Sequence, residues 1–474
     1  MRAGVTYRRG AAWLAAVLIG AWASAAIGSA PVTLNAVLQS AQTHYPQILS
    51  ALEATRAREG SVMAAQGAFD LRLDQFGQLR PAGYYDGNTF SSRLVKPIGN
   101  LGAELYGGYR ISDGTFPIYE NRLRTRDGGE FSAGVILSLW RDRGFDQRRF
   151  DLARTRNELR KAEFELELRK ILIQRDAAGA YLDWVAAGRE LVIYRELLRL
   201  ADLRQNQFAD LVKEGALAQI TLTENLQAVL RRRALVTDAE RMVVRRANTL
   251  SLFLRDAKGT PRVPSEAELP PAFPNLPPVD AAGVEVAVTD ALQVRPDAAM
   301  LAVDSQVEAD RIRLSENLLK PRVNLNLDIA RDVGNGPKNL SGVDTLVRVD
   351  VSIPIERRLG QGRRAEAQAN LNRIRQEQRL LDDRIATEIR NVGNDIDANL
   401  RLMTITAEEL RQAMTMQDAE RERLAEGQSN FFLLNAREET TADVRIRNVR
   451  AERVYEQSLA DFYAATVQWE RLVP

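Results

Sequence analysis

The chain has 474 residues, a length that accommodates two or three domains of ordinary size. Its 65 lysine and arginine residues nearly balance 63 aspartate and glutamate residues, so the net charge gives no sign of a nucleic-acid surface. Cysteine is absent and histidine occurs once, at His44, which excludes disulfides, thiol chemistry and zinc sites built from cysteine and histidine.

Residues 1–30 are typical of a secretory signal peptide. Arg2, Arg8 and Arg9 form a basic start, residues 11–28 are apolar, and small residues near 23–30 offer cleavage sites. The alternative is an N-terminal membrane anchor. No later segment reaches the roughly 18 apolar residues of a membrane-spanning helix. We therefore expect an exported protein.

The chain then repeats one design twice. Pro46 and Pro296 each open a polar helical stretch that runs into a short alternating segment, and the two passages align without a gap. We expect a first structural repeat over residues 31–257 and a second over residues 285–474. Residues 258–284, rich in proline, are predicted to be an extended linker between them.

Four segments alternate between apolar and polar residues, at 69–76, 131–140, 323–330 and 346–355. This period predicts a sheet with one apolar and one polar face. Strands of about ten residues also suit a tilted crossing of a bilayer, although a soluble, half-buried sheet would show the same pattern. Residues 80–129 are predicted to be a long loop. A weaker alternation at 101–111 would extend the sheet or form a hairpin.

Two further segments, residues 145–213 and 363–426, are predicted to be nearly continuous helices on the order of 90–100 Å long. Glu-Gly pairs at 214–215 and 426–427 then mark breaks in the helical pattern. Thr221 or Thr223 is expected to cap the next helix in the first repeat, and Ser429 or Asn430 in the second. Each block is thus predicted to be a long antiparallel hairpin, with tips near 213–221 and 425–432; a simple helix kink is the alternative.

Four strands cannot close a barrel, and open sheet edges are not tolerated in lipid. The smallest closed barrels have about eight strands. Three copies of the chain would supply twelve strands, so a homotrimer is the simplest solution. The charge-rich helices fit the wall of a water-filled tube, whereas a solid coiled-coil rod would explain the helices but not the strands.

This ordered, duplicated set of features resembles the TolC-like family of outer-membrane efflux proteins over essentially the whole mature chain. The resemblance is carried by the two proline-led openings (46–57 and 295–306), the two strand-to-helix junctions (141–159 and 356–374) and the glycine-containing tips. It implies a mainly α fold with a membrane β part: a trimeric 12-stranded β-barrel continuous with a 12-helix periplasmic α-barrel.

The resemblance also implies a function. The chain would be the outer-membrane channel subunit of a tripartite efflux or export system, with a large periplasmic portion. Its partners would be a periplasmic adaptor (membrane fusion) protein, an inner-membrane pump and outer-membrane lipid. It would not be an enzyme, and no cofactor, metal, catalytic residue or nucleic acid is expected. The alternatives are a channel for type I protein secretion and, in another class, a periplasmic coiled-coil scaffold or adaptor.

The family's tip motifs match two stretches of this chain and imply candidate adaptor contacts, unless these residues only turn the chain: Gly215, Ala216, Leu217, Ala218, Thr221, Gly427, Gln428, Ser429 and Asn430. Some relatives place carboxylates just after the second tip, but this chain has Phe431, Phe432 and Asn435 there. We take all three as candidates for a pore constriction, which would be apolar through Phe431 or Phe432, with simple helix packing as the alternative.

The basic segment 229–235 lies among acidic residues. We expect it to form solvated helix faces or interhelical ion pairs.

Overall fold

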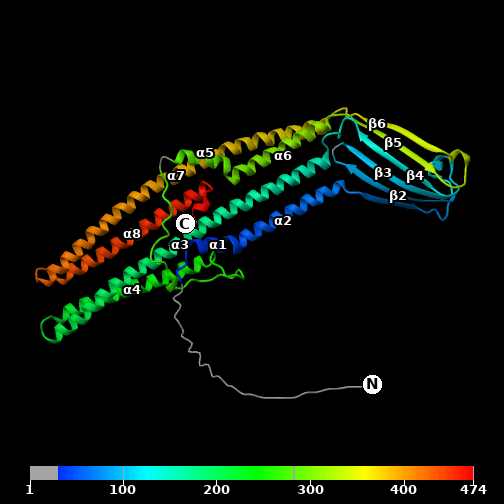
Figure 1. The fold of residues 1–474 in the computed structure, drawn as a ribbon. Coiled ribbons are helices and arrows are strands. Elements are labelled where there is room, and N and C mark those ends of the chain that lie inside the picture. Colours follow the sequence, from blue (N-terminus) through cyan, green and yellow to red (C-terminus); the bar gives the residue numbers. More distant parts are fainter. Residues whose placement is uncertain (1–29, 100, 281–282, 473–474) are drawn as a thin grey trace, which may run out of the picture.

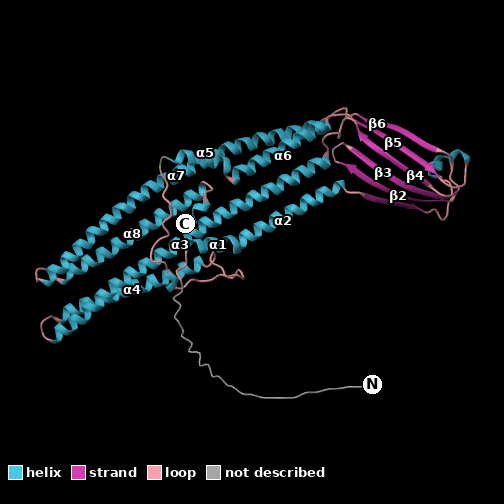
Figure 2. Cartoon of the chain, in the orientation of Figure 1, coloured by secondary structure: helices cyan, strands magenta, loops and turns pink. Residues whose placement is uncertain are grey.

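The computed structural model describes residues 30–99, 101–280 and 283–472, so the expected signal peptide lies outside this part except for its last residue. The molecule is elongated, with a β-sheet at one end and two helical hairpins at the other (Figures 1 and 2). The elements of the first half are α1 (Leu34–His44), α2 (Pro46–Gln66), β1 (Arg72–Gln78), β2 (Gly87–Ile98), β3 (Ala103–Gly114), β4 (Glu130–Ser138), α3 (Gln147–Lys213) and α4 (Gln219–Leu250). Those of the second half are α5 (Val284–Val294), α6 (Pro296–Leu318), β5 (Arg322–Asp332), β6 (Val343–Ser352), α7 (Arg358–Ala425) and α8 (Phe431–Ala465).

The two halves use the same local chemistry. Pro46 and Pro296 stand at the start of α2 and α6, where the fixed φ of proline suits a helix and its missing N–H costs nothing. The two longest helices, α3 and α7, cover the predicted segments with small shifts at their ends. Near the sheet, α2, α3, α6 and α7 lie side by side; at the far end α4 and α8 replace α2 and α6 (Figure 1).

The sheet has six antiparallel strands in the order β1-β2-β3-β4-β5-β6. The prediction of a long loop at 80–129 was therefore wrong, because β2 and β3 occupy this segment. The weaker alternation at 101–111 does extend the sheet, as strand β3. Gly107 interrupts the apolar period in β3, and Ser92 does so in β2. These small residues weaken the alternation on which the prediction depended.

The strand register places apolar side chains on one face across all six strands. Directly paired residues share a face, and so do residues two apart on a strand. This apolar face carries Leu73, Phe90, Leu94, Leu105, Tyr109, Ile111, Phe131, Ala133, Val135, Leu137, Leu325, Leu327, Ile329, Val347, Val349 and Val351. The opposite, polar face includes Arg72, Asp74, Ser91, Arg93, Glu104, Arg110, Glu130, Ser132, Asn324, Asn326, Asp328, Arg348 and Asp350.

The main hydrophobic core lies midway along the molecule, where α1, α3, α5, α7 and α8 meet around the fully buried Trp184 and Leu459. The proline-rich segment runs across this region and is anchored there. Its Leu276 is buried, and the backbone N–H of Leu276 donates to the Glu456 carboxylate at 3.0 Å. Among the described residues, none of the helices is both long enough and apolar enough to cross a membrane.

Candidate functional site

Both helical hairpins turn with the same backbone geometry at their tips. Gly215 and Gly427 adopt φ values of +76° and +74°, a left-handed conformation that glycine reaches without steric cost. At the first tip, Gly215 N donates to Val212 O (3.0 Å) and the next N–H, on residue 216, to Leu211 O (2.9 Å). The second tip repeats this pair of bonds with Gly427 and the residue after it. Each tip is thus a Schellman C-cap, in which glycine ends the helix and satisfies its last carbonyl groups.

The helices that follow the tips begin differently. Asn430 is the N-cap of α8, and its side chain accepts a hydrogen bond from Leu433 N at 3.0 Å, as the sequence predicted. The N-cap of α4 is Ala218, which has no side-chain acceptor, and Thr221 lies in the first turn. The predicted threonine cap was therefore wrong. The first tip has fewer side-chain hydrogen bonds to hold it than the second.

The expected adaptor contacts gather at one end of the molecule, on the two tips (Figure 1). Most of their side chains are exposed; Leu217, Thr221 and Ser429 are half-buried. Ser429 donates to the Glu420 carboxylate on α7, which holds the second turn against its own helix. The tips therefore present mainly small and polar groups to an approaching partner. Their contact with an adaptor remains a prediction.

The residues predicted to constrict the pore take different positions within the subunit. Phe431 packs edge-on against Phe208 of α3, with 5.1 Å between ring centroids, and the Arg204 guanidinium lies 5.1 Å from its ring. Asn435 accepts a hydrogen bond from Arg232 at 2.6 Å. Phe432 has 58% of its surface exposed, and its ring lies 5.5 Å from the Phe431 ring between centroids. Of the three, only Phe432 offers a largely free side chain for a constriction.

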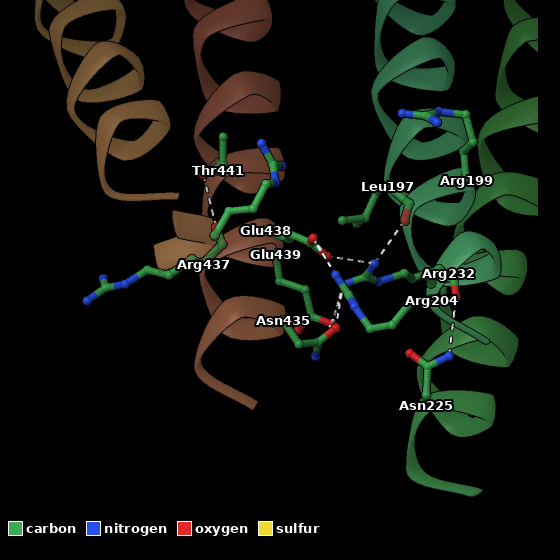
Figure 3. Close-up of polar contacts among 12 residues, drawn as sticks. Leu197, Arg199, Arg204, Asn225, Arg232, Asn435, Arg437, Glu438, Glu439 and Thr441 are labelled. Atoms are coloured by element: carbon green, nitrogen blue, oxygen red, sulfur yellow. Dashed lines mark hydrogen bonds and ion pairs between the residues drawn. The ribbon is translucent and has the colours of Figure 1, made fainter. Parts of the chain in front are cut away.

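A buried ion cluster lies about two to four helical turns from the tips, depending on the helix. It consists of Arg204 on α3, Arg232 on α4 and Glu438 on α8 (Figure 3). One carboxylate oxygen of Glu438 accepts a hydrogen bond from Arg204 Nη2 at 2.5 Å, and the other accepts one from Arg232 Nη1 at 3.3 Å. Arg232 Nη1 also donates to the backbone oxygen of Leu197 at 2.9 Å. Arg232 and Glu438 are only 1% and 2% exposed.

Burying these charges costs free energy of desolvation, and only close contact between opposite charges offsets that cost. Burial lowers the pKa of Arg232, because removal from water disfavours the charged guanidinium, while the nearby carboxylates oppose this effect. Glu439 adds a second, half-buried carboxylate 3.7 Å from Arg232. Removing one partner of a buried ion pair typically costs about 3–5 kcal/mol, since the other charge is left uncompensated. The ion cluster thus holds the second hairpin against the first.

The sequence predicted solvated helix faces or interhelical ion pairs for segment 229–235, and Arg232 does form an interhelical ion pair, with Glu438. The sequence did not predict the burial of Arg232 or its partners. The structure places it between Val229 and Val236, on the stripe of α4 that packs against the neighbouring helices. The helical spacing of three and four residues to these valines was the available signal. Its neighbours Arg231 and Arg233 are exposed, so only the middle arginine is buried.

The sequence matches no protein-family model and no curated protein. The structure, however, resembles solved outer-membrane proteins. It matches VceC of Vibrio cholerae, described as an outer membrane protein, at TM-score 0.62 and 15% identity, covering 91% of this chain and 96% of that chain. It matches the open state of the MtrE outer membrane channel of Neisseria gonorrhoeae at TM-score 0.62 and 12% identity, covering 91% and 88%. The CmeC outer membrane channel of Campylobacter jejuni matches at TM-score 0.61 and 12% identity, covering 91% and 85%.

These matches extend over nearly the whole of each chain, so they concern the complete architecture and not one shared motif. The mainly helical chain with one small antiparallel sheet is confirmed as the fold that the TolC-like resemblance implied. The chain therefore has the fold of TolC-like outer-membrane channels.

Proposed function

We propose that the protein is the outer-membrane channel subunit of a tripartite export system. In this proposal three copies form a continuous passage from the periplasm to the exterior. The observation that carries it is the exposed apolar face of the six-stranded sheet, placed at the opposite end from the charged helical hairpins.

The apolar face supports a lipid environment for the sheet. Large side chains such as Leu94, Phe131 and Val349 are about half exposed, and they continue from one edge of the sheet to the other. Soluble proteins rarely expose contiguous apolar patches larger than a few hundred Å². Most strands have between nine and twelve residues, which suits a tilted crossing of the hydrocarbon core.

The helical part supports a periplasmic conduit. Helices α3 and α7 contain 67 and 68 residues, so each spans on the order of 100 Å. Their outer surfaces carry many exposed arginines and carboxylates, as expected where helices meet water and bury only lateral stripes. A tube built from such helices brings the tips far from the outer membrane. There they would meet the periplasmic adaptor and, through it, an inner-membrane pump.

The resting state of the proposed channel would be closed at the tips. The buried ion cluster keeps α8 against α3 and α4, and Phe432 would contribute an apolar constriction that limits hydration of the pore. A Phe432→Ala variant should therefore show higher conductance in planar bilayers than the unmodified channel. Unchanged conductance would contradict this constriction and leave helix packing as the role of the residue.

Fractionation tests the proposal as a whole. The protein should be recovered in outer-membrane fractions, resist carbonate extraction and run as a trimer in detergent. A monomer that is freely soluble without detergent would refute the proposal and favour a periplasmic scaffold.

Single-cysteine crosslinking tests the adaptor contact, since the chain has no native cysteine. Gly215→Cys and Gly427→Cys should crosslink to a periplasmic protein that co-purifies with the channel. Gln376→Cys is the matched control, because it is exposed on α7 nearer the sheet. Equal crosslinking from all three sites would argue against docking at the tips.

A further inference from the structure

Both edges of the six-stranded sheet lack a partner strand within the described chain. Strand β1 forms one edge and β6 the other. Every residue of β6 is exposed, and so are all but the last residue of β1. Unpaired backbone groups at a sheet edge are not tolerated in lipid, so a chain that enters a membrane must cover both edges.

Strands β2 and β3 belong to the same wall as the other four. Phe90 and Leu94 on β2 continue the apolar face, as do Leu105 and Ile111 on β3. Ser91 and Arg110, which pair directly, lie on the polar face. A hairpin that merely decorated the outside of a four-stranded wall would have no reason to keep this in-and-out alternation in register with its neighbours.

We propose that β1 of one copy pairs antiparallel with β6 of a second copy, with Arg72 opposite Asp350 and Asp74 opposite Arg348. Three copies joined in this way close a wall of eighteen strands, since each contributes six. This inference rests on the proposed channel function and gives eighteen strands in place of the twelve expected from sequence. The occupant of each free edge is therefore the other edge of an identical chain.

The direction and hydrogen-bonding pattern of the two edges agree. In a sheet of six alternating strands β1 and β6 run in opposite directions, so copies related by rotation about the channel axis meet antiparallel. Leu139 N donates to Val323 O between β4 and β5, and this bond fixes the alternation of hydrogen bonds across the sheet. The free N–H and C=O groups then belong to odd-numbered residues on both edges, such as Gln75 and Val347. The proposed register places these residues opposite each other.

Charge selects this register among the alternatives. A shift of two residues in one direction places Asp74 opposite Asp350, and a shift in the other direction places Arg72 opposite Arg348. Like charges directly opposite each other are destabilising, whereas opposite charges stabilise a cross-strand pair. A shift of one residue would turn the apolar face of the partner strand inward.

Apolar contacts support the same register. Phe76 is an apolar residue on the mainly polar face of β1, and it falls opposite Leu346, an apolar residue on the same face of β6. On the lipid side, Leu73 falls opposite Val349. In the isolated subunit Arg72 instead pairs with Asp74 on its own strand, at 2.8 Å, with both side chains exposed. Assembly would exchange this local pair for two pairs between subunits.

An eighteen-stranded wall is also compatible with the helical part. At a spacing of about 4.8 Å and a tilt of about 40°, its circumference is ~110 Å. Twelve helices at interaxial distances of about 9–10 Å give ~110–120 Å. The wall can therefore continue into the helical tube without a marked change in width.

Cysteine pairs in the full-length protein test the register. The double variant Phe76→Cys/Leu346→Cys should give a disulfide-linked trimer on a non-reducing gel, because the paired Cα atoms would lie within the range that a disulfide bridges. Two control pairs, Phe76→Cys/Asp344→Cys and Gln78→Cys/Leu346→Cys, are shifted by two residues and leave the four charged residues unchanged. They should lose the crosslinked trimer. Equal crosslinking of all pairs, or crosslinking only of a shifted pair, would overturn the proposed register.

Charge reversal gives a second readout that does not depend on a disulfide. Asp74→Arg should lose the trimer, since it places an arginine opposite Arg348. The double variant Asp74→Arg/Arg348→Asp should recover it. Failure of the double variant to recover the trimer, while the unmodified protein remains trimeric, would contradict the seam and leave the channel function intact.

Spin labels at single cysteines test the number of strands. A label at Leu94→Cys on β2 should be accessible to a paramagnetic relaxation agent dissolved in the lipid. A label at Ser91→Cys should be accessible to a relaxation agent dissolved in water. If both labels proved accessible only from water in an outer-membrane trimer, β2 would lie outside the wall and the eighteen-stranded closure would be wrong. Absence of the protein from the outer membrane would instead refute the proposed function.

Discussion

Replacement of Glu438 by glutamine removes the only fully buried carboxylate of the ion cluster while keeping the shape of the side chain. The change leaves Arg204 and Arg232 close together, with the half-buried Glu439 as their remaining carboxylate. Both arginines are buried, so water cannot replace the lost charge without the helices moving apart. We therefore expect α8 to separate from α3 and α4 more readily near the tips.

The magnitude follows from the burial of the pair. Breaking a buried ion pair by removing one partner costs about 3–5 kcal/mol. A loss of about 3 kcal/mol from the free energy of local opening corresponds to a population of the open form roughly 100-fold larger. Glu409→Gln is the matched control, because Glu409 pairs with Arg447 across α7 and α8 but both side chains are about half exposed. For such a surface pair we expect about 0.2–1 kcal/mol.

Amide hydrogen exchange of the detergent-solubilised trimer measures this opening directly. In Glu438→Gln, peptides from residues 197–235 and 431–445 should lose protection by about 100-fold, whereas the core near Trp184 should not change. The control variant should differ from the unmodified protein by a few-fold at most. If Glu438→Gln behaved like the control, the cluster would not hold the two hairpins together.

Three other substitutions test separate parts of the structure. Gly215→Ala has space for its methyl group, but at a φ of +76° the left-handed conformation costs an alanine about 1–2 kcal/mol. We expect faster amide hydrogen exchange at the first tip. Unchanged exchange would show that the tip backbone relaxes to another conformation without cost. Gly134→Ala on β4 would bring its Cβ into a clash with Tyr106 Oη, so the heat-dissociation temperature of the trimer should fall. Gly77→Ala on β1 meets nothing within 4 Å and should leave that temperature unchanged. Burial raises the pKa of Glu456 above its ordinary value of 4.5, so the stability contributed by this carboxyl grows as the pH falls through its raised pKa and is complete below 4.5. Glu456→Gln should therefore unfold at higher urea than the unmodified protein at pH 8, with the difference shrinking towards pH 4; a difference independent of pH would contradict this origin.

The features that the sequence predicted correctly are those with a strong local signal. Helices α3 and α7 followed from long runs of helix-forming residues without proline, and their ends followed from Glu-Gly pairs. Strands β5 and β6 followed from uninterrupted alternation of valine, leucine or isoleucine with polar residues. In each case neighbouring residues alone decide the local structure.

The features that it missed depend on residues far apart in the chain. Strand β2 has Ser92 where an apolar residue would have shown the period, and Gly107 left only a weak alternation in β3; pairing with β1 and β4 completes the two strands. The sequence left two interpretations open for segment 229–235, solvated helix faces or interhelical ion pairs, because arginines flank Arg232 on both sides. The burial of Arg232 requires Glu438, 206 residues later, to arrive from another helix. No local pattern contains this information.

The two ends of the subunit differ in how completely they satisfy their own polar groups. Near the tips, Glu438 neutralises buried charges within one chain, so closure of this end needs no second copy to be stable. At the sheet, Arg72 and Asp74 form an exposed ion pair on one strand, and the outward-facing backbone groups of both edge strands have no partner strand within the described chain. We therefore expect subunits to assemble through the sheet, where a single chain leaves backbone groups unpaired. We expect the channel to open at the tips, where a partner must supply the free energy that separates helices already held together by the ion cluster.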